Sequence, residues 1–423
     1  MMQNFWKIPG NITKKAKLNK IEGLELNITN EKASENFSFA NITITGKHTK
    51  FNCNKLRLPV NKQPLDNNNL NSIENYTQII KNLLNEKYYL QKRPLFTKLP
   101  FNYTKIPVPI RLFLNKILLK QKKDTKFPGW PIEKSVELIR HHYIYTLKEK
   151  LKRNIPYISF WPYNADFAFS VSHDCDSNSS FKNIGKIRDI ERKYNIRSSW
   201  NFVPCKYKID FKKVKALKDE GCEIGLHGFN HSGKLPYLNK NKISNQLKLG
   251  LNKLKRYNPK GFRSPLLLRN QKFLKALSNH FEYDSSVPDT DIEHPLNYRN
   301  GCCTIFPFFT GKMVELPLTL PQDVRLRRMN LNKQQTLSIW KEKLEFIRKN
   351  KGLAMLNIHP DNFASGNEFG LDCYEMLLKH ISKINKKWLA LPYEVAEWWK
   401  ERNTSYISKG KIIGSKRAKI EYF

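Results

Sequence analysis

Hydrophobic and polar positions follow two alternating patterns along the second half of the chain. Short apolar segments predict strands at residues 167–172, 198–203, 223–226, 261–264, 304–309, 353–358 and 388–391. Apolar residues at helical spacing between several of these segments predict helices at residues 181–194, 211–220, 242–257, 333–349 and 371–384. Such an alternation is typical of a parallel sheet covered by helices, in which the carboxyl ends of the strands gather their loops on one face.

The first part of the chain follows a different pattern, in which short alternating segments predict a small antiparallel sheet followed by helices. The predicted elements are strands at 24–29, 37–45 and 56–60, a polar loop at 64–71, and helices at 74–89 and 135–151. This region has no catalytic constellation, so we expect it to pack beside the later domain or to orient substrate toward it.

The domain organisation follows from this change of pattern. We expect an N-terminal α+β accessory region at residues 1–155, a (β/α) domain at residues 156–402 and a basic C-terminal tail at residues 403–423. A chain of 423 residues is long enough for such a division and for a large core.

The chain is strongly basic, with 75 Lys and Arg against 37 Asp and Glu and a formal net charge of +38. The charge is spread along the whole length, and no zinc-finger, recognition-helix or RNA-binding sheet motif accompanies it, so nucleic acid is a poor candidate partner. Attraction to anionic glycans, nucleotide-linked sugars or acidic lipid headgroups remains physically reasonable.

Seven cysteines without regular spacing argue against a disulfide framework and favour a reducing compartment. The N-terminus lacks the continuous apolar core of a signal peptide, and no later run reaches transmembrane length. We therefore expect a cytoplasmic protein.

Candidate chemistry lies directly after the predicted strands, where a barrel builds its active site. The residues are Asp174, Asp176, His227, His231, Arg263 and His359. One Asp and two His form a set of ligands for a divalent metal ion. Two carboxylates two positions apart lie on one face of a continuing strand and can divide the roles of ligand and base.

Each of these residues also has an ordinary structural interpretation. Asp174 and Asp176 could cap a helix that begins near Ser180, and a His-x-x-x-His pair is often a surface or core pair. Arg263 could be a surface cation and His359 a turn residue. Their occurrence together favours the functional interpretation. We expect His173 and Cys175, which point to the opposite face of the strand, to serve packing.

Four segments resemble, in order, the motifs of polysaccharide deacetylases of the NodB homology type, carbohydrate esterase family four. They are Ser-His-Asp174-Cys-Asp176, His227-Gly-Phe-Asn-His231, Phe262-Arg263-Ser-Pro265 and Leu356-Asn-Ile-His359-Pro. The resemblance covers about residues 163–399. It implies an α/β fold, a distorted seven-stranded (β/α) barrel, and a divalent metal held by one Asp and two His.

The site roles follow from this resemblance together with the chemistry of amide hydrolysis. Asp176, His227 and His231 are the expected ligands of Zn²⁺, with Co²⁺, Mn²⁺ or Ni²⁺ as alternatives. Asp174 is the expected base and His359 the expected acid, while Arg263 keeps Asp174 ionised.

Two points in this assignment stay open. Cys175 separates the two aspartates, which are adjacent in the family. If the strand continues through Asp176, either carboxylate could be the base; if the chain turns at Cys175, Asp176 swings toward the histidines. The second geometry is favoured because loops after barrel strands begin about there. For the residue that tunes His359, the candidates are Asp289 and Asp291.

Three functions remain as hypotheses. The leading one is a metal-dependent hydrolase that removes an acetyl group from an N-acetylated saccharide. The hypothesis includes anionic saccharides and saccharides linked to a nucleotide or a lipid. The alternatives are a catalytically inactive glycan-binding barrel and a basic nucleic-acid-associated protein.

Overall fold

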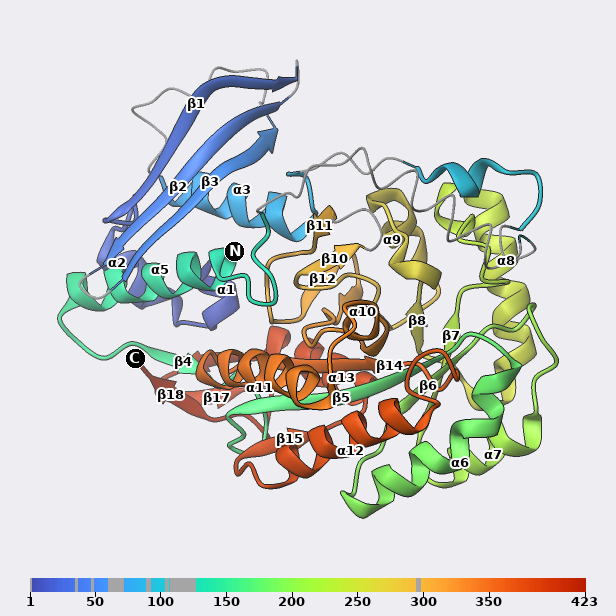
Figure 1. Cartoon of the computed structure of the whole chain (residues 1–423). Coiled ribbons are helices and arrows are strands. Elements are labelled where there is room, and N and C mark those ends of the chain that lie inside the picture. Colours follow the sequence, from blue (N-terminus) through green and yellow to red (C-terminus); the bar gives the residue numbers. More distant parts are fainter. Residues whose placement is uncertain are drawn as a thin grey trace.

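The computed structural model in Figure 1 has two parts, an N-terminal α+β region and a larger α/β barrel. The residues that it describes are 2–34, 37–46, 49–59, 72–88, 93–102, 106, 127–293 and 298–423. The loop predicted at 64–71 lies outside the described residues. Among the helices in these ranges, none is both long enough and apolar enough to cross a membrane.

The N-terminal region is a three-stranded antiparallel sheet with helices packed beside it (Figure 1). Its strands are β1 (Leu24–Ser34), β2 (Phe37–Gly46) and β3 (Thr49–Pro59), and its helices are α1 (Met2–Trp6), α2 (Gly10–Ala16), α3 (Ile73–Leu84) and α5 (Ser135–Leu151). The predicted sheet and both predicted helices are confirmed, but the strands are longer than predicted and α3 ends earlier. The helices α1 and α2 were not predicted.

The second part is built on one curled sheet. In spatial order its strands are β12 (Phe308–Thr310), β13 (Met313–Glu315), β9 (Tyr283–Asp284), β8 (Gly261–Arg263), β7 (Glu223–His227), β6 (Ser199–Phe202), β5 (Phe167–Cys175) and β14 (Leu353–Ile358), and β15 (Lys387–Leu389) also pairs with β5. All neighbours in this order are parallel except β12 and β13.

Backbone hydrogen bonds join the two edges of this sheet. Thr319 and Leu320, which follow β13, donate through their backbone N–H groups to Met355 O of β14 at 3.2 and 3.0 Å. The ring therefore runs through the parallel strands β5, β6, β7, β8, β9, β13 and β14. The predicted fold, a distorted seven-stranded (β/α) barrel with an N-terminal α+β region, is confirmed.

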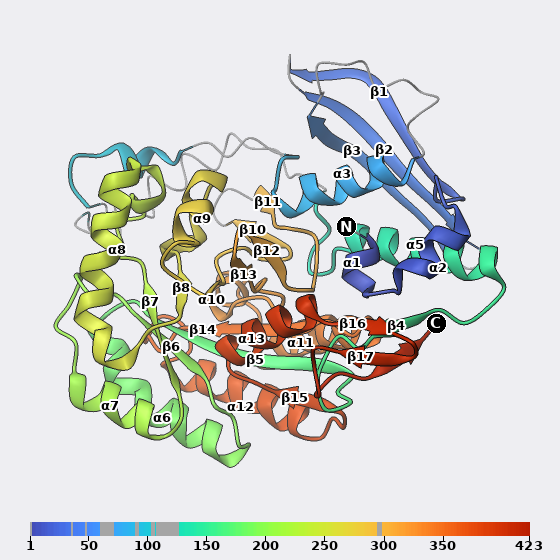
Figure 2. The same cartoon turned by 180° about the vertical axis from the view of Figure 1, so that it is seen from behind.

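Helices surround the barrel in Figures 1 and 2. They are α6 (Asn178–Lys193), α7 (Phe211–Asp219), α8 (Lys240–Leu254), α9 (Gln271–Leu277), α10 (Asp323–Arg328), α11 (Lys333–Lys349), α12 (Glu368–Ser382) and α13 (Pro392–Thr404). Most begin after a residue whose side chain accepts a backbone hydrogen bond from the first turn: Ser177, Asp210, Asn239, Asn270, Asn332 and Asn367. The five predicted helices are confirmed, whereas α9, α10 and α13 were not predicted.

One predicted strand is wrong in its position and its role. Of residues 304–309, only the last two belong to a strand, β12, and the chain then reverses at Gly311, whose φ of +64° suits a glycine, into β13. The strand that enters the barrel is β13. Neither β13 nor β9 was predicted.

The C-terminal residues fold back onto the barrel. A hairpin of β16 (Tyr406–Ser408) and β17 (Lys411–Ile413) precedes β18 (Ile420–Tyr422), which pairs antiparallel with β4 (Pro156–Ile158). Figure 2 shows β16, β17 and β4 beside the C-terminus. The ring of Phe423 packs 4.6 Å from that of Trp6 in α1, so the two ends of the chain are in contact.

A buried ion pair ties the N-terminal region to the barrel. Glu86 follows α3, and Arg269 lies in the loop after β8; the guanidinium donates to both carboxylate oxygens, with Nε at 2.7 Å from Oε2. The two residues are 3% and 7% exposed. Nearby, the hydroxyl of Tyr88 donates to Gly301 O at 2.7 Å. Since a buried charge is costly without its partner, this pair makes the docking of the two parts specific.

We predict that Glu86→Gln lowers the free energy of unfolding by about 3–5 kcal/mol, because it leaves the Arg269 charge buried without its partner. The measurement is the midpoint of urea unfolding. As a control, Glu375→Gln removes an exposed partner of Lys193 at 3.0 Å and should cost at most about 1 kcal/mol. Equal effects of the two substitutions would contradict the prediction.

Candidate active site

The six candidate site residues lie at the carboxyl end of the barrel, as expected. Asp174 is the second-last residue of β5, and Asp176 follows that strand. His227 ends β7, and Arg263 ends β8. The other two, His231 and His359, lie in the loops after β7 and β14. Adjacent parallel strands therefore bring together residues that are far apart in the sequence.

The backbone leaves β5 at Cys175, which places the two carboxylates differently. Ser172 and Asp174 face the barrel interior, while His173 faces the helices, where its Nε2 lies 2.8 Å from Glu191 Oε1. After the strand ends, the backbone N–H of Asp176 donates to Asp361 Oδ2 at 3.2 Å. This contact fixes the turn that directs Asp176 toward the histidines.

Three side chains converge at one point. Asp176 Oδ1 lies 3.1 Å from His227 Nε2 and 3.0 Å from His231 Nε2. One ligand atom from each of the three residues lies within 4.8 Å of the others. The side chains are largely buried, with exposed fractions of 15%, 3% and 5%. A carboxylate and two imidazoles in this arrangement are a ligand set for a divalent cation.

The protonation states of these groups fit a cation. Burial would raise the pKa of Asp176, but His231 outweighs it and holds that pKa well below its usual value, so the carboxylate is ionised. Burial lowers the pKa of His231, which favours the neutral imidazole. Ligands of a metal need these two states.

Two further contacts support the same interpretation. His227 Nδ1 lies 3.1 Å from the carbonyl oxygen of Arg263, which can only accept, so Nδ1 carries the proton and the lone pair is on Nε2. Asp176 Oδ1 is buried and has no partner with hydrogen-bond geometry among the described residues, although both Nε2 atoms are near it. A cation between these three atoms would satisfy that oxygen.

Asp174 is held by hydrogen bonds on both oxygens. Asn201 Nδ2 donates to Oδ1 at 3.0 Å, and Asn357 Nδ2 donates to Oδ2 at 2.8 Å. The residue is 2% exposed. Burial alone would raise the pKa of Asp174, but the neighbouring side chains of His227, Arg263 and His359 outweigh burial and lower this pKa to about 2. Asp174 is therefore a fully ionised carboxylate in a fixed orientation.

Arg263 provides the permanent positive charge beside Asp174. Its Nη1 lies 3.5 Å from Asp174 Oδ2, and its Nη2 donates to Ser172 Oγ and Ser285 Oγ, both at 3.0 Å. The side chain is 1% exposed. One guanidinium thus links the strands β5 and β8 with the segment after β9.

His359 lies beside Asp174, with Nε2 at 3.9 Å from Asp174 Oδ2. Its Nδ1 donates to Asp323 Oδ1 at 2.7 Å, and its backbone N–H donates to Asp323 Oδ2 at 2.8 Å. Burial would lower the pKa of His359, but Asp323 outweighs burial and raises it to about 9. The imidazole is therefore protonated at neutral pH.

The prediction that Asp289 or Asp291 tunes His359 is wrong. Asp289 forms a buried ion pair with Lys343 of α11, and Asp291 pairs with Arg325 Nε at 3.0 Å. The partner is Asp323, the first residue of α10. Both rejected residues follow β9, and cations of α10 and α11 pair with their carboxylates.

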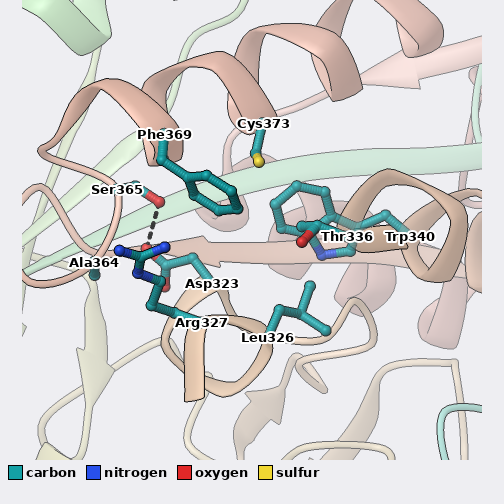
Figure 3. Close-up of a pocket in the computed structure, with 10 residues that line it drawn as sticks. Asp323, Leu326, Arg327, Thr336, Trp340, Ala364, Ser365, Phe369 and Cys373 are labelled. Carbon is teal, nitrogen blue, oxygen red and sulfur yellow. Dashed lines mark hydrogen bonds between the residues drawn. The ribbon is translucent and has the colours of Figure 1, made fainter. Parts of the chain in front are cut away.

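Figure 3 shows how Asp323 itself is held. Ser365 Oγ donates to Asp323 Oδ2 at 2.6 Å, and Arg327, one turn further along α10, extends over the ring of Phe369 at 4.7 Å. A cavity of about 20 Å³ lies beside these residues, enough for about one water molecule. The carboxylate is thus fixed by three donors, all of them from His359 and Ser365 in the loop after β14.

Sequence reasoning missed Asp323, Asn201 and Asn357. Asp323 follows the apolar segment that contains β13, the same pattern that marked the other candidates, but that segment was not predicted as a strand. The two asparagines interrupt otherwise apolar or aromatic strands, in Ser199-Trp-Asn-Phe202 and Leu353-Ala-Met-Leu-Asn-Ile358. An amide inside a buried strand needs a polar partner, and that requirement could have identified both.

Comparison with known proteins gives similarity at the level of solved structures. No protein-family model and no curated protein matches the sequence. The chain is similar to a candidate polysaccharide deacetylase from Mycobacterium smegmatis, with a TM-score of 0.47 and 18% identity over 59% of this chain and 96% of the other. It is similar to the allantoinase PuuE, with a TM-score of 0.46 and 14% identity over 57% and 92% of the two chains.

A third similar structure is a pseudoenzyme of carbohydrate esterase family four from Bacillus anthracis, with a TM-score of 0.39 and 12% identity over 56% of this chain and 66% of the other. The similar structures thus include polysaccharide deacetylases, as the resemblance of the four motifs implied. They also include an allantoinase and a protein described as a pseudoenzyme.

We predict that a His227→Ala, His231→Ala double variant loses its tightly bound divalent ion, because it removes two of the three converging ligand atoms. Asp176→Asn should weaken metal affinity about tenfold or more by removing the negative charge. The measurement is metal content by mass spectrometry after dialysis. His280→Ala, outside the site, serves as the control. One divalent ion per chain in the double variant would place the metal elsewhere.

Proposed function

We propose that this protein is a metal-dependent hydrolase that removes an acetyl group from an N-acetylated sugar or a related saccharide. The observation that carries the proposal is the convergence of Asp176, His227 and His231 next to the pair formed by Asp174 and His359. Amide hydrolysis needs an activated water, a positive centre for the developing oxyanion and a proton for the departing amine. These residues can supply all three.

A divalent cation, most suitably Zn²⁺ and otherwise Co²⁺, Mn²⁺ or Ni²⁺, lowers the pKa of a water molecule and polarises an amide carbonyl. Asp176, His227 and His231 would hold it. Asp174 is the base in this proposal: its Oδ2 takes the proton of the attacking water, while Asn357 and Arg263 keep the carboxylate in place.

His359 is the acid in this proposal. With Nδ1 bonded to Asp323, its Nε2–H is the proton that faces the site and can be given to the departing nitrogen. The pKa of about 9 keeps this proton in place at neutral pH. The pKa of Asp174 is thus lowered and that of His359 is raised. Such a pair of groups is typical of an active-site base and acid.

The substrate is proposed to be an N-acetylated saccharide, free or linked to a nucleotide or a lipid. The formal net charge of +38 supports an anionic form of it, because a basic surface raises the local concentration of anions. The competing proposal is a catalytically inactive glycan-binding barrel, which would keep the saccharide contacts without turnover.

The experiment that tests the function combines metal analysis of the purified protein with acetate release from a panel of N-acetylated nucleotide sugars and oligosaccharides. Acetate release that depends on the bound metal would support the hydrolase. Saccharide binding without acetate release from any member would support the inactive barrel.

We predict that Asp174→Asn lowers kcat about 10²–10⁴-fold while the protein keeps its metal, because it removes the base but none of the three ligands. The measurements are acetate release at saturating substrate and metal content of the same sample. Asp219→Asn, on the exposed side of α7, is the control. Lost metal with Asp174→Asn, and retained metal with Asp176→Asn, would reverse the roles of the two aspartates.

We predict that Asp323→Asn moves the alkaline limb of the pH–rate profile to lower pH by about one unit or more. His359 must be protonated to act, so activity is present below its pKa and falls as the pH rises through it. Because Asp323 is the group that raises this pKa, removing its charge lowers the pKa. An unchanged alkaline limb would show that His359 is not the titrating acid.

A further inference from the structure

His231 differs from His227 in how its ring is held. The Nδ1 atom of His227 is bonded to the Arg263 carbonyl, whereas Nδ1 of His231 is buried without a hydrogen-bond partner among the described residues. Ligand histidines are usually oriented by a bond on the second ring nitrogen. The direction in which His231 points its Nε2 therefore depends on its backbone.

The backbone at His231 is in an unusual conformation. Its φ is +57°, in the left-handed region that side chains other than glycine rarely adopt, and Gly228 and Gly233 on either side have φ values of +64° and +70°. Such a conformation persists only where the surroundings fix it. The loop of residues 228–237 thus needs support from outside itself.

Part of this support comes from the barrel. The backbone N–H of Cys205 donates to Phe229 O at 2.9 Å, and the ring of Pro265 lies against Gly228, where a Cβ atom would be 2.5 Å from Pro265 Cγ. These contacts hold the first residues of the loop, those before His231.

The residues after Phe229 contact both the barrel, where Asn270 Nδ2 donates to Pro236 O at 2.7 Å, and the N-terminal region. The segment 93–102, which contains a short 3₁₀ turn (Leu95–Lys98), lies against the loop from Asn230 to Tyr237 and is called the clamp below. Asn102 Nδ2 donates to Asn230 O at 3.4 Å, immediately before His231. From the loop side, Lys234 Nζ donates to Leu99 O.

Two further contacts complete this interface. The ring of Phe96 approaches the backbone of Gly233 so closely that a Cβ there would lie 3.2 Å from it. The guanidinium of Arg93 lies 5.4 Å from the ring centre of Tyr237. The clamp therefore contacts the loop at positions before and after His231, opposite Leu268 of the barrel, which also lies against Gly233.

The clamp has a defined shape of its own. Arg93 Nε and Nη2 donate to Thr97 Oγ1 and Thr97 O at 3.0 and 2.8 Å, and Thr97 is 1% exposed. Further back along the chain, the buried pair of Glu86 and Arg269 anchors the N-terminal region to the loop after β8. A structured segment anchored in this way can transmit its position to the loop.

We propose that the clamp is a positioning element of the metal centre, which holds loop 228–237 in the conformation that aims His231 Nε2 at Asp176 Oδ1. The proposal rests on the metal site in the proposed function. It gives the N-terminal region a part in metal affinity although none of the three converging ligand residues belongs to it. The affinity for the metal is then a property of two regions that are separate in the sequence.

The test measures metal affinity in the full-length protein. The clamp variant is Phe96→Ala with Asn102→Ala, which changes no residue of the loop, and the loop variant is Lys234→Met. Lys213→Met is the matched control, because Lys213 Nζ donates to the carbonyl of Phe181 at 2.7 Å, a bond of the same kind between α7 and α6. Lys234→Arg keeps a donor for Leu99 O.

We expect the Zn²⁺ dissociation constant, measured by competition with a chromophoric chelator, to rise about tenfold or more in the clamp variant and in Lys234→Met. Lys213→Met should leave it unchanged, and Lys234→Arg should restore most of the loss. The visible spectrum of the Co²⁺ form should change in the clamp variant and stay the same in Lys213→Met. A general loss of stability would not produce this change in the spectrum.

Three outcomes overturn the proposal. Wild-type affinity in both the clamp variant and Lys234→Met would refute the clamp while leaving the metal site intact. An equal loss in Lys213→Met would show that the effect is one of stability. If the wild-type protein bound neither Zn²⁺ nor Co²⁺, the proposed function and the clamp would both fail. Should the clamp variant not fold, Lys234→Met and Lys234→Arg decide the question alone.

Discussion

A negative charge inside the barrel is the constraint on which the rest of the site depends. Removing a carboxylate from water costs several kcal/mol unless partners compensate it, and Asp174 is 2% exposed. Arg263 supplies the opposite charge and two asparagines supply amide donors. The guanidinium is bonded in turn to two serines on other strands. The carboxyl end of the barrel is therefore a connected polar network within an apolar ring, and each member needs the others.

Patterns that are local in the sequence predicted most of the barrel. Long apolar segments such as those of β5 and β14, and amphipathic helices such as α11, were found in place because a strand or helix of that length leaves a clear periodicity. The six candidate residues were found for the same reason, since each follows or ends a strand that was predicted. Parallel pairing of the strands then places these residues together at the carboxyl end of the barrel.

Features that depend on contacts between distant segments could not be predicted in this way. The short strands β9 and β13 are defined by their pairing with each other and with β8, which no local pattern in the sequence shows. The partner of His359 was misassigned for this reason, since Asp323 reaches it only after β13 has entered the barrel. The contact of Lys234 with the N-terminal region could not be predicted either, because it joins two loops, which show no hydrophobic periodicity.

The closure of the ring has a consequence for the synthesis of this protein. Ala168 of β5 pairs with Leu353 of β14. During translation, this edge of β5 therefore stays unpaired until most of the chain has been synthesised. An unpaired parallel edge that persists during translation is a site at which nascent chains can associate. A large net charge of one sign opposes such association. The net charge of +38 would therefore oppose the association of unfinished chains during translation.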